Sequence, residues 1–512
     1  MKQSYTKNYL KIYLWQGISL VLNFLSMFIV IPYLTSDPTT YGIYTVCISF
    51  TIFLAYADLG FMGAGQKYAA EYFARGEIKE EIKVIGFTNF ILLIFLLLFS
   101  VGFFILSFQP ELLVNGLTTE KQISIASSLL LTLAIFTPVT LLQRLLQMIF
   151  GIRMEDFIVQ RTNIVASLLR ILSVLWFFKN GKYDIVGYFL FLQIVNLLAA
   201  VCTLIIAKKR YNYNFIILFK SLRFDKAVYN KTKGLAFTSL YLTVSWILYY
   251  ELDPVSIGKL LGAKQVAIYA IGLTILTFFR SILGIVFSPF NVRFNHFIGF
   301  GDEEGLKKFV IQVVSILAPI VVFPIVTIAI LANPIVLSWV GINYLDSVEI
   351  IQFLVFCNLF AFISYPIATL LMAKERQKEM YFVGTLLPFV FWVGILVSFQ
   401  FWGLKSFAIF KLIAFVLSAI VYYGIMLKYL GINFFESVHK IFKPMFFSIL
   451  FLIVSTFIIR DYLPVEKAKI NFLIVALITG ILILISFVIQ YFSSENWRIQ
   501  INKTLKFLKR ID

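Results

Sequence analysis

Long apolar runs, most of them long enough to cross a lipid bilayer as a helix, follow one another along almost the whole chain. A hydrocarbon core about 30 Å thick needs roughly 20 helical residues at a rise of about 1.5 Å each. We place fourteen spans near 11–34, 41–63, 85–108, 123–143, 162–178, 185–207, 234–252, 267–288, 309–331, 350–372, 381–401, 406–427, 444–459 and 471–492. Charged residues make up only 14% of the chain, against about 25% in soluble domains. The sequence therefore predicts an all-α polytopic membrane protein with about fourteen transmembrane helices.

The cations of the chain lie mainly in alternate connections between these spans. The connection between the sixth and seventh spans is the richest and carries Lys208, Lys209, Arg210, Lys220, Arg223, Lys226, Lys231 and Lys233. Basic loops stay on the cytoplasmic side of a membrane, so we expect both termini in the cytoplasm. The net charge of +18 is thus explained by a membrane face, and no nucleic-acid partner is expected.

Three short matches at a nearly constant offset predict an internal repeat. The segment YGIY ending at Tyr44 matches VAIY ending at Tyr269, and GEIKEEIKV from Gly76 matches GDEEGLKKF from Gly301. GIRMED around Arg153 similarly matches AKERQKE around Arg376. Transporters are often built from such repeats, with the substrate site between them. We predict two six-helix lobes, 1–210 and 211–430, followed by 431–512 with two further spans and a basic cytoplasmic tail.

Polar side chains within spans are costly in hydrocarbon and therefore mark candidate functional positions. Our candidates for a water-filled cavity are Gln16, Asn23, Asp58, Arg170, Tyr241, Ser245, Tyr249, Thr277 and Arg280, and those for ion coupling or gating are Asp58, Glu251 and Asp253. Each type of residue also has a structural interpretation. Ser and Thr can form hydrogen bonds between packed helices. Asp58 could pair with Lys67 or cap a helix break at Gly60, and Arg170 could form a structural ion pair.

The sequence gives little support for an enzyme. There is no GxxxxGK[ST] loop for ATP, and the two histidines, His296 and His439, fall in predicted loops. We therefore expect no catalytic residues, no metal site and no bound cofactor.

Two segments carry a resemblance to a known family. Asp58-Leu59-Gly60 closes the second span and is followed by KYAAEYFARGEIKE, and ELDPVSIGKLLGAKQVAIYAIG runs from Glu251 to Gly272. In this order on a fourteen-span chain they resemble the polysaccharide-export (Wzx-type) lipid-linked oligosaccharide flippases. These belong to the multidrug/oligosaccharidyl-lipid/polysaccharide exporter superfamily. The turn after Asp253 departs from the family pattern at Ala267, where a glycine is usual.

The resemblance implies a function. Such flippases move an undecaprenyl-pyrophosphate-linked oligosaccharide from the cytoplasmic to the outer leaflet of the bacterial inner membrane by alternating access. The product serves O-antigen (lipopolysaccharide), capsule or related polysaccharide assembly. The resemblance also implies a cavity lined by spans 1, 2, 7 and 8, with Arg280 and Arg170 receiving pyrophosphate or acidic sugars. Coupling to an H⁺ or Na⁺ gradient is implied, as are membrane lipids, a polysaccharide polymerase and other glycan-assembly proteins as partners.

Three alternatives stay open. A lipid II flippase of the same superfamily is disfavoured because the first span is uncharged beyond Lys11. A multidrug cation exporter would have twelve spans and carboxylates at its binding site. A non-transporting scaffold for glycan-assembly enzymes would need neither Arg280 nor a repeat.

Overall fold

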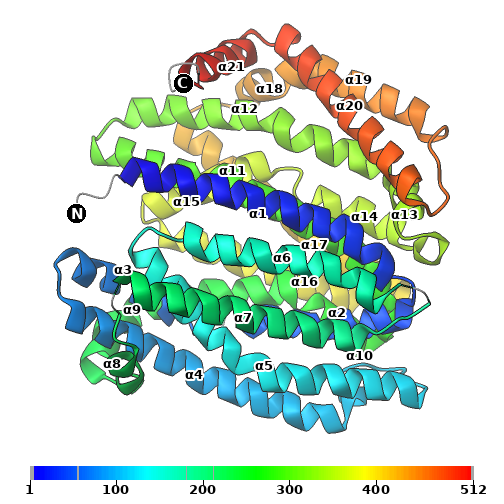
Figure 1. Cartoon of the computed structure of the whole chain (residues 1–512). Coiled ribbons are helices and arrows are strands. Elements are labelled where there is room, and N and C mark those ends of the chain that lie inside the picture. Colours follow the sequence, from blue (N-terminus) through cyan, green and yellow to red (C-terminus); the bar gives the residue numbers. More distant parts are fainter. Residues whose placement is uncertain (1–4, 55–56, 180, 212, 509–512) are drawn as a thin grey trace. The chain divides into compact units, whose positions relative to one another are not determined.

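The computed structural model describes residues 5–508 except 55–56, 180 and 212 (Figure 1). Helices dominate, and no strand occurs among these described residues. They include eleven helices that are long and apolar enough to cross a membrane, or twelve if one bent pair forms a single span. The prediction of an all-α, multi-pass membrane protein is therefore confirmed, whereas the number fourteen stays a prediction.

The chain divides into two compact units, Met1–Ala267 and Ile268–Asp512. The first unit contains α1 (Tyr5–Leu34), α2 (Pro38–Leu54), α3 (Phe61–Ala74), α4 (Ile78–Phe108), α5 (Glu120–Ile152), α6 (Phe157–Phe177), α7 (Ile185–Tyr211), α8 (Phe215–Lys220), α9 (Lys226–Trp246) and α10 (Asp253–Leu261). Within it α4 packs along α5, and α6 packs against both α1 and α7 (blue to green in Figure 1). One side of α1 is a stripe of exposed apolar side chains at Leu14, Ile18, Val21, Leu25 and Ile29.

The second unit holds most of α11 (Ala263–Gly299) and all later helices. These are α12 (Glu303–Ile330), α13 (Ala332–Trp339), α14 (Ser347–Phe356), α15 (Ala361–Ala373), α16 (Gln377–Trp402), α17 (Leu404–Leu430), α18 (Phe434–Ile441), α19 (Phe446–Arg460), α20 (Lys469–Ser493) and α21 (Glu495–Leu508). Helix α12 is central to this unit, because α14, α15, α19 and α20 all pack against it.

These units are divided differently from the predicted lobes. The first unit extends beyond 1–210 because the segments after α7 pack back onto it. Helix α8 lies on α4, α9 on α3 and α10 on α2. The predicted appendage 431–512 lies within the second unit, because α19 and α20 pack on α12.

The second predicted span, 41–63, is broken in the structure. Helix α2 ends at Leu54, and α3 starts after a turn in which Leu59 and Gly60 have φ of 50° and 79°. A Cβ at Gly60 would lie 2.4 Å from the Ala236 carbonyl oxygen of α9, so both the backbone and the packing require glycine here. With 17 residues, α2 is shorter than the roughly 20 needed to span a bilayer.

The seventh and tenth predicted spans are also irregular. In 234–252 the α-helix changes to a π-helix at Ile247–Glu251, and α10 restarts with Pro254 in its first turn. Proline is tolerated there because first-turn N–H groups have no helical partner. The span 350–372 forms α14 and α15, which are bent by 44°.

Two helix ends in different units share one turn geometry. The turn after α5 contains Met154 at φ 53°, and the turn after α15 contains Glu375 at φ 54°. In both turns the next N–H donates to the carbonyl five residues earlier, at 3.0 and 2.9 Å. In the match of Arg153 with Arg376 these two turns are out of register by two residues, so the repeat stays a prediction.

Gly42 of α2 allows the close approach of α2 to the turn between α10 and α11. A Cβ at this position would lie 1.8 Å from the Ala263 carbonyl oxygen, which is backbone and cannot rotate away. We expect Gly42→Ala to destabilise the protein by about 1–3 kcal/mol through overpacking. The measurement is thermal stability in detergent. The matched control is Gly102→Ala in α4, where a Cβ meets nothing within 4 Å. Wild-type stability of Gly42→Ala would contradict this packing.

Candidate functional site

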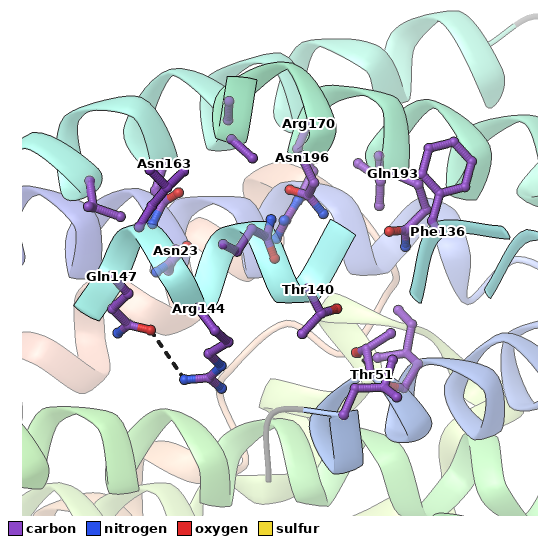
Figure 2. A pocket seen from close by; sticks show the side chains of 18 of the residues that line it. Asn23, Thr51, Phe136, Thr140, Arg144, Gln147, Asn163, Arg170, Gln193 and Asn196 are labelled. Atoms are coloured by element: carbon purple, nitrogen blue, oxygen red, sulfur yellow. Dashed lines mark hydrogen bonds between the residues drawn. The ribbon is translucent and has the colours of Figure 1, made fainter. Parts of the chain in front are cut away.

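The first unit contains a large open cavity of about 1030 Å³ (Figure 2). Helices α1, α2, α3, α5, α6 and α7 all contribute to its wall. Pockets for drug-sized ligands have volumes of about 300–1,000 Å³. The cavity is therefore large enough for a bulky polar ligand of several rings.

Carboxamide side chains are the most frequent polar groups on this wall. They are Gln16, Asn23, Gln66, Gln143, Gln147, Gln160, Asn163, Gln193 and Asn196. On α5, α6 and α7 they recur at spacings of three or four, and on α1 at nearly two turns, so that each pair shares one helix face. An amide presents both donors and an acceptor, and such groups match the hydroxyls of carbohydrates, which also donate and accept.

Two arginines and one aspartate are the charged residues among the described side chains that line the cavity. Arg144 of α5 donates from Nη1 to Gln147 Oε1 at 3.2 Å, as the dashed line in Figure 2 shows. Nε of Arg170 in α6 is buried and has no hydrogen-bond partner among the described residues. Asp156 lies in the turn between α5 and α6. The wall therefore carries a net positive charge, which favours an anionic ligand.

The two arginines lie at different depths. The turn between α5 and α6 marks one end of the cavity, which we call the Asp156 end. Arg144 precedes the end of α5 at Ile152 by a helical distance of about 12 Å, at about 1.5 Å per residue. Arg170 follows the start of α6 at Phe157 by about 20 Å. Arg170 is thus about 8 Å deeper along the helix axes.

Aromatic side chains form the opposite end of the cavity. The ring of Tyr44 in α2 lies 5.8 Å from that of Phe189 and 6.5 Å from that of Tyr188, both in α7. Tyr183, in the loop before α7, donates its hydroxyl to the carbonyl of Leu34 at 2.6 Å. Arg170 lies within electrostatic reach of Tyr44 and Tyr188. The deeper arginine is therefore next to this aromatic wall.

A buried ionic cluster fixes the turn that carries Asp156. Nη2 of Arg153 donates to Glu81 Oε1 of α4 at 2.8 Å. The guanidinium of Arg153 also lies over the rings of Phe73, Tyr211 and Tyr213, at 4.6, 4.8 and 5.3 Å from their centroids. Because Glu81 is fully buried and Arg153 almost so, this pair ties the end of α5 to α4.

Glu155 extends the cluster to the end of α7. Its carboxylate accepts two hydrogen bonds of 2.6 Å from Nε and Nη2 of Arg210, and a further one from the Tyr211 hydroxyl. Burial raises the pKa of Glu155, but these bonds and the charges of Arg210 and Arg153 hold it below its ordinary value. The cluster thus sets where α5, α6 and α7 begin or end, and with them the cavity wall.

Three of the predicted site residues line the cavity, namely Gln16, Asn23 and Arg170. Asp58 lies elsewhere. It is buried at the break between α2 and α3, where its Oδ2 accepts a hydrogen bond of 2.8 Å from the Met62 N–H. This is the helix-break geometry that was one of its predicted alternatives.

Five further candidates lie on α9, the π-helical stretch and α10, none of which is part of the described cavity wall. Tyr241 is exposed, and Ser245 donates to its carbonyl at 3.0 Å. The ring of Tyr249 packs on Trp246 and Tyr250. Glu251 is buried and accepts a 3.3 Å hydrogen bond from Trp246 Nε1, and Asp253 is fully buried at the start of α10.

Thr277 and Arg280 belong to α11 in the second unit. The carbonyl of Thr277 accepts a 2.9 Å hydrogen bond from Ser281. Arg280 is partly buried and within electrostatic reach of Tyr365 on α15. Both stay candidates for a site in that unit.

Arg144 and Asp156 are cavity residues that the sequence interpretation missed. The fourth span was predicted to end at 143, which placed Arg144 in a loop, whereas α5 continues to Ile152. The run LLQRLLQMIF is apolar apart from Gln143, Arg144 and Gln147. Their spacing on one helical face was the signal that could have revealed them.

Comparison with known proteins agrees with this architecture. The structure is similar to the inward closed conformation of the lipid II flippase MurJ, with a TM-score of 0.66 and 12% identity over 95% of this chain and 99% of that chain. The chain therefore shares its fold with this flippase. An inward-facing MATE multidrug resistance transporter of the MOP superfamily gives a TM-score of 0.63 and 12% identity, over 82% of this chain and 94% of that one.

A third similar structure is a MOP superfamily transporter. This transporter, from Pyrococcus furiosus, matches with a TM-score of 0.55 and 14% identity over 83% of this chain and 96% of that chain. It is described as having a binding pocket of reverse polarity that suggests a different function. Searches of family models and of curated proteins give no match. The fold is thus shared with these transporters, whereas the ligand depends on the chemistry of the cavity.

Proposed function

We propose that this protein is a flippase for an undecaprenyl-pyrophosphate-linked oligosaccharide. It carries the headgroup from the cytoplasmic to the outer leaflet of the bacterial inner membrane, for O-antigen, capsule or related polysaccharide assembly. The observation that carries this proposal is the first-unit cavity, which combines many carboxamides with two arginines.

The cavity chemistry fits such a headgroup. A pyrophosphate diester carries two negative charges, and Arg binds phosphate oxygens through charge-assisted hydrogen bonds. The sugars present hydroxyls, which the carboxamides of α5, α6 and α7 can both donate to and accept from. The lipid tail needs no cavity because it can stay in the bilayer while the headgroup moves through water and polar side chains.

The same chemistry disfavours a multidrug cation exporter. A cationic drug needs carboxylates in its site, and Asp156 is the sole acid among the described residues of the wall, against Arg144 and Arg170. The superfamily fold is common to both functions, so the charge of the wall is the feature that separates them.

A lipid II flippase is the second candidate, because the MurJ structure matches 95% of this chain. Lipid II also carries a pyrophosphate and sugars. On the described wall α1 supplies Gln16, Asn23 and Ser26 but no cation. The absence of a cation from the described α1 wall agrees with the sequence analysis, in which the uncharged first span disfavours a lipid II flippase.

The proposed mechanism is alternating access between two lobes of about seven spans each, fourteen in all. With both termini in the cytoplasm, the Asp156 end of the cavity faces inward and the aromatic wall faces outward. We propose that an H⁺ or Na⁺ gradient drives the cycle, with Asp58, Glu251 and Asp253 as coupling or gating residues, and that a polysaccharide polymerase receives the product.

The test is deletion of the gene, followed by analysis of surface glycan and of lipid-linked intermediates. We expect surface glycan to be lost and a lipid-linked oligosaccharide to accumulate on the cytoplasmic leaflet. Accumulated lipid II with cell lysis would support the second candidate. Unchanged glycan together with new drug sensitivity would contradict both and favour an exporter.

Asp156 makes ligand binding depend on pH. Burial raises the pKa of this carboxyl above its ordinary value, so it is protonated at a higher pH than an exposed aspartate. Falling pH removes its negative charge and leaves Arg144, with the neutral Gln66 and Gln160, around the ligand. We expect an anionic ligand to bind more tightly as the pH falls through the raised pKa of Asp156. Asp156→Asn should bind tightly throughout.

The measurement is equilibrium binding of farnesyl diphosphate-linked N-acetylglucosamine, whose diester phosphates stay ionised through this pH change. Asp225→Asn is the matched control, because this partly buried cap of α9 has a lowered pKa, chiefly through the hydrogen bond from the Val228 N–H, and lies outside the cavity wall. An Asp156→Asn protein with the wild-type pH profile would refute the assignment.

A further inference from the structure

We propose that the oligosaccharide carried by this protein bears an acidic group of its own, and that Arg170 binds it while Arg144 binds the pyrophosphate. This inference rests on the proposed function and makes its substrate class more specific. The acidic group is a carboxylate or a phosphate attached to a sugar, such as that of a uronic acid.

The depth of the two arginines separates their ligands. The pyrophosphate is bonded directly to the lipid, whose tail stays in the cytoplasmic leaflet when the headgroup enters the cavity. It therefore meets the cation nearer the Asp156 end, which is Arg144. Arg170 lies about 8 Å deeper along the helix axes, where the attached sugars and not the pyrophosphate would be.

The surroundings of Arg170 favour the binding of an anion. Its Nε is buried without a hydrogen-bond partner among the described residues, and Arg170 forms no ion pair within the described part of the chain. Arg170 is half-buried on the wall of the open cavity, and a cation inside a membrane span is costly without a counter-charge. A neutral glycan would supply hydroxyls there but no charge.

The groups around Arg170 would also bind an acidic sugar. Tyr44 and Tyr188 line the same end of the cavity, and both carry hydroxyls that can donate to a carboxylate. Asn196 of α7 lines the wall there as well, and Figure 2 shows it next to Arg170 in the view. The described wall has its single acid, Asp156, at the opposite end, so no protein carboxylate competes for this cation.

The test uses the full-length protein in lipid nanodiscs and two synthetic probes. Both are farnesyl diphosphate-linked disaccharides that begin with N-acetylglucosamine, one ending in galactose and the other in glucuronic acid. We expect the wild-type protein to bind the glucuronic acid probe at least about tenfold more tightly, the effect of one charge-assisted hydrogen bond. Arg170→Gln should lose this preference without weakening the galactose probe, and Arg170→Lys should retain part of it.

Two variants serve as comparisons. Arg144→Gln should weaken both probes alike, because both carry the diphosphate. Arg161→Gln is the matched control, since Arg161 lies on the same helix but outside the cavity wall, with its guanidinium 4.5 Å from the centroid of the Trp15 ring. It should leave both affinities unchanged.

Other results would overturn the inference in distinguishable ways. Equal weakening of both probes by Arg170→Gln would show that Arg170 binds the pyrophosphate. Equal affinity of the wild-type protein for the two probes would show that no acidic sugar is selected. Failure of the wild-type protein to bind either probe would instead contradict the proposed function itself.

Discussion

Replacing Arg153 by Ala is expected to destabilise the protein by about 3–5 kcal/mol, because Glu81 is then left buried as an unpaired charge. The side chains of Glu81 and Arg153 are 0% and 7% exposed, and 2.8 Å separates their charged atoms. Arg153 also loses its contacts with three aromatic rings. Thermal unfolding in detergent and the yield of monodisperse protein measure the loss.

A double replacement separates the charge from the packing. Removing both partners, as in Glu81→Leu with Arg153→Leu, should cost less than Arg153→Ala alone, because no unpaired charge is left buried. Lys440→Ala is the comparison for a surface pair, since the side chains of Lys440 and Glu436 are 48% and 42% exposed, and it should cost at most about 1 kcal/mol. Equal stability of Arg153→Ala and wild type would contradict the buried pair.

Replacing both cavity arginines by Gln is expected to reduce flipping by at least about 100-fold, since each cation loses a charge-assisted interaction worth about tenfold or more. The measurement is the amount of surface glycan in a strain whose only copy of this protein carries both Arg144→Gln and Arg170→Gln. The variant and the wild-type protein are compared at equal levels in the membrane. Arg161→Gln should restore glycan fully. Full restoration of surface glycan by the double variant would show that flipping does not depend on these two cavity arginines.

The fold could be predicted from the sequence because a membrane helix is specified by local composition. Apolar runs alone located α4, α12 and α20 to within several residues. The broken spans could not be predicted in the same way. The break after α2 depends on positive φ at Leu59 and Gly60 and on the approach of α9 to Gly60. Hydropathy does not record such contacts between distant segments.

The cavity was only partly accessible for a related reason. Gln16, Asn23 and Arg170 were found because a polar residue inside an apolar run is conspicuous. Arg144 was missed because a polar residue near the end of a run reads as the start of a loop. The actual end of α5 is set by the cluster of Arg153 and Glu81, which joins residues far apart in the sequence. Such a cluster is visible in the structure alone.

The most direct test of the central claim is a photo-crosslink from the cavity wall to the cargo. A benzophenone amino acid is placed at Asn163, which lines the cavity on α6, or at Leu172 of the same helix, which is 63% exposed and outside the wall. After illumination of glycan-synthesising cells, the purified protein is probed for lipid-linked oligosaccharide. We predict a crosslink from position 163 and little or none from position 172. A variant that restores surface glycan but gives no crosslink from position 163 would contradict the claim that the headgroup crosses the membrane through this cavity.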